Sequence, residues 1–271
     1  MNIEMIRAAQ ARLEGHARRT PLLSAPDLDA VAGRRLFLKA ENLQHTGSFK
    51  FRGGWSALSA LDDAQRKAGV IAFSSGNHAQ GVALAAREHG VTAVIVMPSN
   101  APQTKIAATR ALGADVVLYD RATEDRKAIG QALAAERGLT LIEPSDNAQV
   151  IAVQGTTGLE IADQARDAGV TSAEVLVCCG GGGFTSGIAL ALEAEAPDMR
   201  VRPVEPENFD DVARSLRSGQ REVNAAMSGS ICDAIISPQP GEITFPILHR
   251  LCGPGIIVTD DECLQAMAYA F

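Results

Sequence analysis

Residues 174–187 read EVLVCCGGGGFTSG. An apolar, partly β-branched run ends in four glycines, and an Ala- and Leu-rich helical segment follows at 184–196. This order predicts a strand, a glycine loop and a helix, in which backbone N–H groups at the helix N-terminus can bind a phosphate. The stretch lacks the P-loop lysine, which argues against nucleoside triphosphate hydrolysis. Taken alone, it also fits a flexible glycine loop.

The same alternation continues along the chain and predicts an α/β fold. Continuous apolar runs are typical of strands covered on both faces, and strands that alternate with helices form parallel sheets. The predicted strands are at 35–40, 69–74, 92–97, 115–119, 139–143, 174–179 and 200–204, and the predicted helices are at about 49–61, 77–90, 103–113, 121–137, 148–168 and 184–196.

Composition excludes several classes of protein. The 271 residues are 46% hydrophobic with a net charge of -7, which argues against nucleic acid or an anionic membrane as a partner. The sequence has no apolar run of the roughly 20 residues that span a bilayer, and its N-terminus has no signal-peptide core, so we expect a cytoplasmic protein. The five cysteines lack CxxC spacing and fit structural thiols.

A second motif, residues 41–54, reads ENLQHTGSFKFRGG and places Lys50 in the first turn of a helix. The helix dipole and partial desolvation by Phe49 and Phe51 favour a neutral amine, which can act as a nucleophile. The alternative is a solvated surface lysine.

A third motif, residues 73–81, reads FSSGNHAQG and also lies between a strand and a helix. Its hydroxyl, amide and N–H groups suit a carboxylate and a phenolate-like oxygen. The alternative is a helix start capped by Asn77. All three motifs follow predicted strands, and such turns converge on one crevice in an open α/β sheet.

In this order, and with the segments MPSNAPQTK at 97–105 and QGTTGLEIA at 154–162, the motifs resemble the pyridoxal phosphate (PLP) enzymes of the threonine/serine dehydratase and serine racemase family. The resemblance runs from about residue 20 to the end. It implies the tryptophan synthase β-subunit fold (fold type II), with two open, twisted, mostly parallel sheets and flanking helices. PLP would lie in the cleft between a large domain, 1–65 and 147–271, and a small domain, 66–146.

The resemblance also assigns residues. Lys50 would be the Schiff-base lysine and proton carrier, Ser75 the acid/base hydroxyl on the other face, and Phe49 would stack near the pyridine ring. Asn77 would hydrogen-bond the phenolic oxygen. The phosphate would be bound by Gly180, Gly181, Gly182, Gly183 and the N–H of Phe184, and the substrate carboxylate by Ser75, Gly76, Asn77 and His78.

A cation site is implied in the same way. Glu205, the carbonyl of Phe209 and Asp211 match the family's divalent-cation site, and such oxygen ligands suit Mg²⁺ or Ca²⁺. A capped acidic helix start is the alternative.

The implied activity is that of an ammonia-lyase, which converts serine, threonine or 3-hydroxyaspartate to a 2-oxo acid and ammonia. A racemase would share Lys50 and Ser75. Two segments depart from better-known members: 142–147, IEPSDN, where relatives usually have His-Pro-Phe-Asp, and 229–246, GSICDAIISPQPGEITFP. We also expect a homodimer and no regulatory domain.

The C-terminus leads to a separate expectation. A helix that opens at 259–262 runs to Phe271 without a cap, and the family's residue beside the pyridine nitrogen comes from a later motif. We expect the C-terminal part of the large domain to be missing, or this end of the chain to be covered by something else. An inactive truncated fragment is a third alternative for the function, beside the lyase and the racemase.

Overall fold

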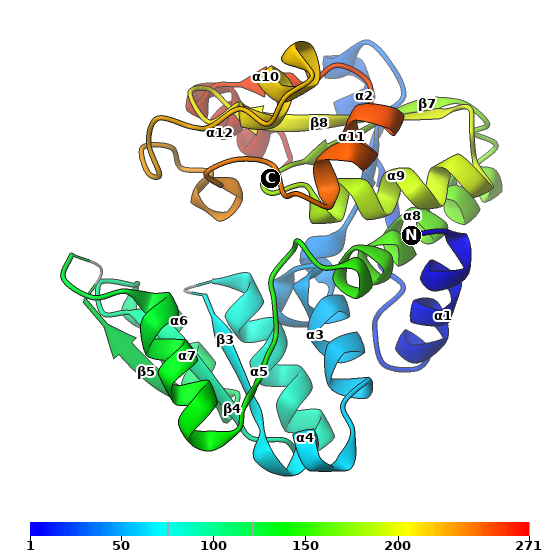
Figure 1. Cartoon of the computed structure of the whole chain (residues 1–271). Coiled ribbons are helices and arrows are strands. Elements are labelled where there is room, and N and C mark those ends of the chain that lie inside the picture. Colours follow the sequence, from blue (N-terminus) through cyan, green and yellow to red (C-terminus); the bar gives the residue numbers. More distant parts are fainter. Residues whose placement is uncertain (75, 121, 271) are drawn as a thin grey trace. The chain divides into compact units, whose positions relative to one another are not determined.

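The computed structural model describes residues 1–74, 76–120 and 122–270. The described chain divides into two compact units (Figure 1). Unit 1 comprises 1–8, 20–40 and 145–271, and unit 2 comprises 9–19 and 41–144. Residues 41–65, which were predicted to belong to the large domain, pack with unit 2. The predicted domain boundaries stay a prediction.

Unit 2 is built on a parallel sheet in the order β5-β4-β3-β6. Its core contains Ile71, Val94, Val96, Tyr119 and Leu139, and every residue of the central strand β4 is buried. The strands are β3 (Val70–Phe73), β4 (Ala93–Pro98), β5 (Asp115–Tyr119) and β6 (Thr140–Leu141). The helices are α3 (Lys50–Ser59), α4 (Asp63–Ala68), α5 (Asn77–His89), α6 (Gln103–Ala111) and α7 (Arg126–Arg137), with short 3-10 turns η1 (Glu41–Leu43) and η2 (His45–Gly47).

Helices α3 and α5 lie side by side in unit 2, as Figure 1 shows. A Cβ built on Gly54 would stand 2.7 Å from the carbonyl oxygen of Gly81, and one built on Gly81 would stand 2.9 Å from the carbonyl carbon of Lys50. Only glycine permits two helix backbones to approach this closely. The two glycines therefore fix the spacing between the helix that begins with Lys50 and the helix that begins with Asn77.

Unit 1 contains a parallel sheet in the order β7-β8-β9 and an antiparallel pair, β1 with β2. The strands are β1 (Leu22–Ser24), β2 (Phe37–Lys39), β7 (Ala173–Cys178), β8 (Met199–Pro206) and β9 (Ile256–Val258). The helices are α2 (Pro26–Ala32), α8 (Ala148–Asp167), α9 (Gly183–Glu195), α10 (Asp211–Ser218), α11 (Thr244–Leu251) and α12 (Asp260–Ala270), with the turn η3 (Asp233–Ile235). Helix α1 (Ile3–Leu13) begins in unit 1 and ends in unit 2.

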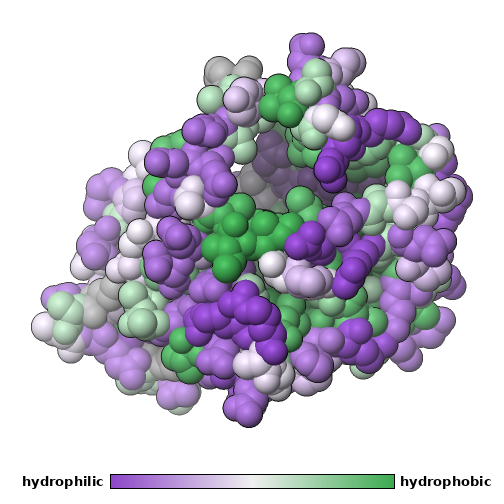
Figure 2. All heavy atoms as spheres, turned by 90° about the horizontal axis from the view of Figure 1, so that it is seen from above, coloured by the Kyte–Doolittle hydropathy of each residue, from purple (hydrophilic) through white to green (hydrophobic). Residues whose placement is uncertain are grey.

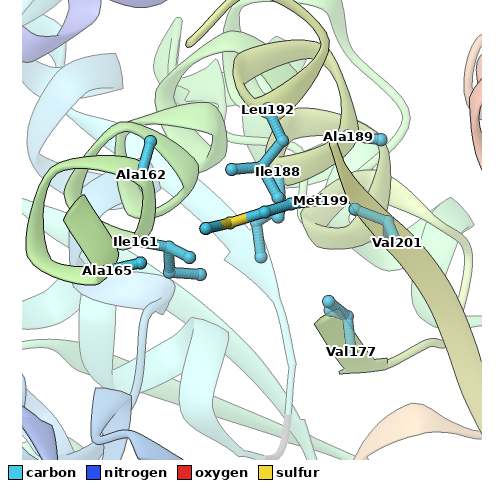
Figure 3. Close-up of a cluster of buried hydrophobic side chains, with 9 residues drawn as sticks. All are labelled: Ile161, Ala162, Ala165, Val177, Ile188, Ala189, Leu192, Met199 and Val201. Carbon is cyan, nitrogen blue, oxygen red and sulfur yellow. The ribbon is translucent and has the colours of Figure 1, made fainter. Parts of the chain in front are cut away.

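A core of unit 1 lies between α8, α9 and the strands β7 and β8. Figure 3 shows the side chain of Met199 extending from β8 toward Ile161 of α8, beside Ile188 of α9. Leu192 of α9, with 1% of its surface exposed, belongs to the same cluster. The apolar runs that predicted strand and helix here are the residues that fill this core.

The predicted elements differ from the structure at a few places. The run at 35–40 forms an antiparallel pair with β1 rather than a strand of a parallel sheet. The helix predicted at 121–137 begins only at Arg126, because Asp120 accepts a hydrogen bond from the backbone N–H of Ala122 in a local turn. Strands β1 and β9, of three residues each, were not predicted.

The surface carries hydrophobic residues in separate patches among hydrophilic ones on the face that Figure 2 shows. Large exposed hydrophobic residues include Leu264, Met267 and Tyr269 of α12. Within the described part of the chain, no helix is both long and apolar enough to cross a membrane.

Candidate active site

Lys50 is the first residue of α3, and Phe49 is its N-cap. The Lys50 amine donates a hydrogen bond to the carbonyl of Pro144 at 2.9 Å and lies 5.1 Å from the centroid of the Phe49 ring. The lysine therefore sits in the first helical turn, as the sequence predicted. The aromatic ring predicted to accompany it lies within reach of the amine.

A buried ion pair closes the loop that leads to Lys50. Arg52, 1% exposed, donates to both carboxylate oxygens of Glu41, from Nε at 2.9 Å and from Nη2 at 2.7 Å. A bidentate pair of this kind fixes both orientation and distance. Sequence reasoning missed the pair, although two opposite charges near the ends of one motif were a signal for it.

One buried polar atom of this loop lacks a partner in the described part of the chain. Ser48, which precedes Phe49 and Lys50, is buried, and its hydroxyl oxygen makes no hydrogen bond among the described residues. An unsatisfied buried hydroxyl costs free energy unless a ligand or water supplies the missing bond. The loop is thus suited to a polar ligand at this point.

The N-terminus of α5 presents backbone N–H groups without a side-chain cap. Gly76 is the N-cap and Asn77 is the first helical residue, so Asn77 does not cap the helix. The first N–H groups of a helix have no intrahelical partner, and the dipole there favours an anion. Ser75, the predicted acid/base residue, lies outside the described residues.

His78 is held inside unit 2 by a hydrogen bond. Its Nε2 lies 3.0 Å from the carbonyl oxygen of Ile142, so that nitrogen carries the proton and donates it. Burial, followed by the positive charge of Lys50, lowers the pKa of His78 to about 4. The ring is therefore neutral at physiological pH, so the group that His78 can offer to an anion is its backbone N–H.

Gly180, Gly181 and Gly182 lie in the loop between β7 and α9 in unit 1, and Gly183 is the first residue of α9. Gly182, with φ at +91°, is the N-cap of α9 and provides no side chain to cap it. A Cβ on Gly180 would stand 2.9 Å from the carbonyl oxygen of Ile235, and one on Gly183 would stand 3.0 Å from that of Ser145. Side chains are excluded behind the loop, so its own backbone is what it can offer to a ligand.

Thr244 holds this loop directly, and Asp146 holds the segment that leads to Thr244. The hydroxyl of Thr244 donates to the carbonyl of Gly181 at 2.6 Å. Asp146 accepts from the backbone N–H groups of Glu242 at 2.8 Å and Ile243 at 3.1 Å, just before α11. Neither role was predicted. The acidic side chain in the atypical segment at 142–147 was the available signal.

Glu205, Phe209 and Asp211 are all buried in unit 1. Each Glu205 oxygen accepts a backbone N–H of α10, from Val212 at 2.9 Å and Ala213 at 2.7 Å. Burial raises the pKa of Glu205 to about 8 and that of Asp211 to about 6. The helix-capping role is realised, while Asp211 accepts from the side chains of Asn224 and Ser237. Carboxylate and carbonyl oxygens are the ligand type that hard cations prefer.

The donor sets fit PLP. A bare glycine backbone at a helix N-terminus suits its phosphate. A lysine beside an aromatic ring suits its aldehyde and pyridine. The unpartnered hydroxyl of Ser48 and the uncapped start of α5 leave polar groups for a ligand in the described part of unit 2.

Known proteins are similar to this chain over most of its length. An L-threo-3-hydroxyaspartate ammonia-lyase from Pseudomonas sp is 48% identical over 266 residues, which are 98% of this chain and 82% of that protein. A serine racemase from Schizosaccharomyces pombe is 39% identical over 97% of this chain and 80% of that protein. The crystal structure of a T.th. threonine deaminase has a TM-score of 0.94 and 43% identity, over 100% of this chain and 86% of that one.

These likenesses confirm the predicted α/β fold of type II and the resemblance drawn from the three motifs. The family described as pyridoxal-phosphate dependent enzymes matches residues 13–271, and the chain belongs to that family.

Proposed function

We propose that this chain is an ammonia-lyase that converts a small L-hydroxyamino acid to a 2-oxo acid and ammonia, with L-threo-3-hydroxyaspartate as its preferred substrate. Serine and threonine are the next candidates. Relatives named as L-threo-3-hydroxyaspartate ammonia-lyases, at 48% and 42% identity, support this choice of substrate. The atypical segments at 142–147 and 229–246 agree with a substrate other than threonine.

One observation carries the proposal. Lys50 begins α3, Asn77 begins α5, and the glycine contact between these helices sets the two helix starts against each other within unit 2. A nucleophilic amine and an anion-binding helix N-terminus at fixed spacing are what an α-amino acid needs. Its carboxylate is bound while its α-proton is removed.

Each of several residues would bind a different part of PLP. Gly180–Gly183 and the N–H of Phe184 would hold the phosphate of PLP, Phe49 would pack beside its ring, and Asn77 would bond its phenolic oxygen. When bound, PLP supplies an electron sink for the bond that breaks at Cα. Lys50 would attach the cofactor and carry the α-proton.

Residues 75–78 would bind the substrate. Backbone N–H groups at the start of α5, from Gly76 to His78, would receive the substrate carboxylate, and Ser75 would be the acid/base hydroxyl. Because His78 is neutral and donates to Ile142, it would stabilise this turn without acting as a general acid at neutral pH. The hydrogen bond of its buried ring to Ile142 would hold the start of α5 in place.

The overall reaction balances without a redox partner. The substrate loses its α-proton and its β-hydroxyl as water, and one water is then consumed as the amine leaves as ammonia. 3-Hydroxyaspartate thus gives oxaloacetate and ammonia. The Lys50 amine donates to the carbonyl of Pro144, and it would have to lose its extra proton before its lone pair can react.

A racemase is the second candidate, because a serine racemase is 39% identical to this chain. To distinguish the two, we would incubate the purified protein and PLP with 3-hydroxyaspartate, L-serine and L-threonine. We would measure 2-oxo acid and ammonia alongside the amount of D-amino acid. Equimolar 2-oxo acid and ammonia, fastest from 3-hydroxyaspartate, supports the lyase. D-amino acid formed faster than 2-oxo acid contradicts it.

Three further predictions from the sequence belong to this proposal. Glu205, the carbonyl of Phe209 and Asp211 would bind Mg²⁺ or Ca²⁺ in unit 1. The chain would form a homodimer in the cytoplasm.

A further inference from the structure

Two cysteines of unit 1 lie with their sulfur atoms 3.7 Å apart. Cys232 directly precedes η3, and Cys263 lies in α12. A disulfide has a sulfur–sulfur distance of about 2.05 Å, so the two atoms would have to approach by about 1.7 Å. Rotation of two side chains covers such a distance.

Asp260, the first residue of α12, ties the two segments together. Its carboxylate accepts from the Ser230 hydroxyl at 2.5 Å and from the backbone N–H of Ile231 at 3.1 Å. The backbone N–H of Cys232 in turn donates to the Ser230 hydroxyl at 3.0 Å. The sulfur atoms are therefore kept near each other by a hydrogen-bonded link between the segments.

Ile235, at the end of the segment 230–235, lies against Gly180 of the glycine loop. The backbone N–H of Ile235 donates to the carbonyl of Cys232 at 3.1 Å. The Ile235 carbonyl oxygen is 2.9 Å from the position that a Cβ on Gly180 would occupy. One turn of 3-10 helix thus connects Cys232 to the backbone that would hold the cofactor phosphate.

We propose that Cys232 and Cys263 form a reversible disulfide that fixes the segment 230–235 behind Gly180 and so slows release of the cofactor phosphate. The second half of this inference rests on the proposed function, because it requires PLP at the glycine loop.

A small disulfide such as oxidised glutathione serves as the oxidant. One protein thiolate attacks a glutathione sulfur, forms a mixed disulfide and expels a glutathione thiolate. The second protein thiolate attacks the protein sulfur of the mixed disulfide and expels the other glutathione. Two electrons pass from the protein thiols to the oxidant, and the two protons end on the two glutathione thiols.

The surroundings of the thiols set the rate. Burial, the neighbouring Cys232 and the carboxylates of Asp260 and Glu262 raise the pKa of the Cys263 thiol. Exchange needs the thiolate, so it is slow at neutral pH and faster in alkaline buffer. Burial also raises the pKa of Cys252 to about 12, which keeps that thiol out of the exchange.

The first test maps the bond. The protein is equilibrated in alkaline glutathione buffers of increasing oxidised fraction, quenched with acid, alkylated and digested. Trypsin places Cys232 in the peptide 222–250 and both Cys252 and Cys263 in 251–271, and cleavage before Asp260 separates the last two. We expect a reducible cross-link between Cys232 and Cys263.

Variants make the assignment specific. Cys263→Ser and Cys232→Ser should each abolish the cross-link, whereas Cys178→Ser, at an exposed cysteine, should retain it. Alkylation of both Cys232 and Cys263 at every glutathione ratio would overturn the proposal. So would pairing of Cys263 with Cys252.

The second test measures cofactor release. PLP dissociation is followed from reduced and oxidised wild type and from Cys263→Ser, with released cofactor trapped by an added amine. We expect several-fold slower release from the oxidised wild type and one common rate for both states of the variant. Equal rates in both states of the wild type would refute the link to Gly180. A protein that binds no PLP in either state would contradict the proposed function and this link together, while the peptide map would still decide the disulfide.

Discussion

Replacing Gly81 with alanine tests whether the contact between α3 and α5 sets the position of Lys50. The new Cβ would stand 2.9 Å from the carbonyl carbon of Lys50, 3.0 Å from its oxygen and 3.0 Å from the nitrogen of Phe51. All three are backbone atoms, so no side chain can rotate away. Since carbon atoms in contact lie about 3.5–4.0 Å apart, α3 must withdraw by roughly 0.5–1 Å.

The expected loss of stability in Gly81→Ala is small, whereas the expected loss of activity is large. Alanine gains about 1 kcal/mol over glycine in a helix, and overpacking costs about 1–3 kcal/mol, so we expect the free energy of unfolding to fall by about 0–2 kcal/mol. A displacement of about 1 Å at a reacting group can cost about a hundredfold in rate. For Gly81→Ala we therefore expect kcat/KM to fall about tenfold or more.

The assay pairs urea unfolding with kcat/KM for 3-hydroxyaspartate. Arg87→Ala, which changes a half-exposed side chain in the last turn of the same helix, is the control and should alter neither quantity. Wild-type stability together with wild-type kcat/KM in Gly81→Ala would refute the reasoning, because the clash could then be relieved without moving Lys50.

Four other outcomes follow from buried groups, each measured by unfolding. Burial and Lys50 lower the pKa of His78 from 6.5 to about 4, so in this range the unfolded chain binds a proton that the folded protein does not. Stability should therefore fall by up to about 3 kcal/mol as pH drops from 6.5 to about 4, and His78→Gln should flatten this part of the urea-measured profile. Lys39→Met leaves the Glu160 carboxylate, 2.5 Å from the lysine amine and on a side chain only 12% exposed, without that partner. The change should cost about 3–5 kcal/mol, most of which Lys39→Met/Glu160→Leu recovers. Leu192→Ala, at a side chain 1% exposed, should lower the free energy of unfolding by about 2–5 kcal/mol. Mg²⁺ or Ca²⁺ should raise the unfolding temperature of the wild type but not of Glu205→Gln, and an equal rise in both would place the cation elsewhere.

Much of the fold could be predicted because its elements are encoded locally. The run at 92–97 is continuously apolar and became β4, which is buried along its length, and the helix predicted at 148–168 is α8, Ala148–Asp167. Strands β1 and β9 are only three residues long, and their pairing with distant strands defines them. Such elements have no local period to detect.

In the site, too, local features could be predicted from the sequence, whereas long-range contacts could not. The position of Lys50 in the first turn of α3 follows from a local sequence pattern, and the structure places it there. The contact of its amine with Pro144 joins residues 94 positions apart, and Asp146 meets the start of α11 from a similar distance along the chain. These partners depend on tertiary packing, which no short motif encodes. The roles of the individual residues toward PLP and substrate stay predictions.

The most direct test of the account asks whether Lys50 holds PLP. The purified protein, Lys50→Ala and Lys67→Ala would each be incubated with PLP, scanned in the visible range, reduced with borohydride and digested for mass mapping. Lys67 is an exposed lysine of α4 and serves as the matched control. If Lys50 holds the cofactor, we expect a visible band in the wild type and in Lys67→Ala, cofactor mass on the peptide that contains Lys50, and neither signal in Lys50→Ala. An undiminished band in Lys50→Ala, or cofactor fixed to another lysine in the wild type, would contradict it.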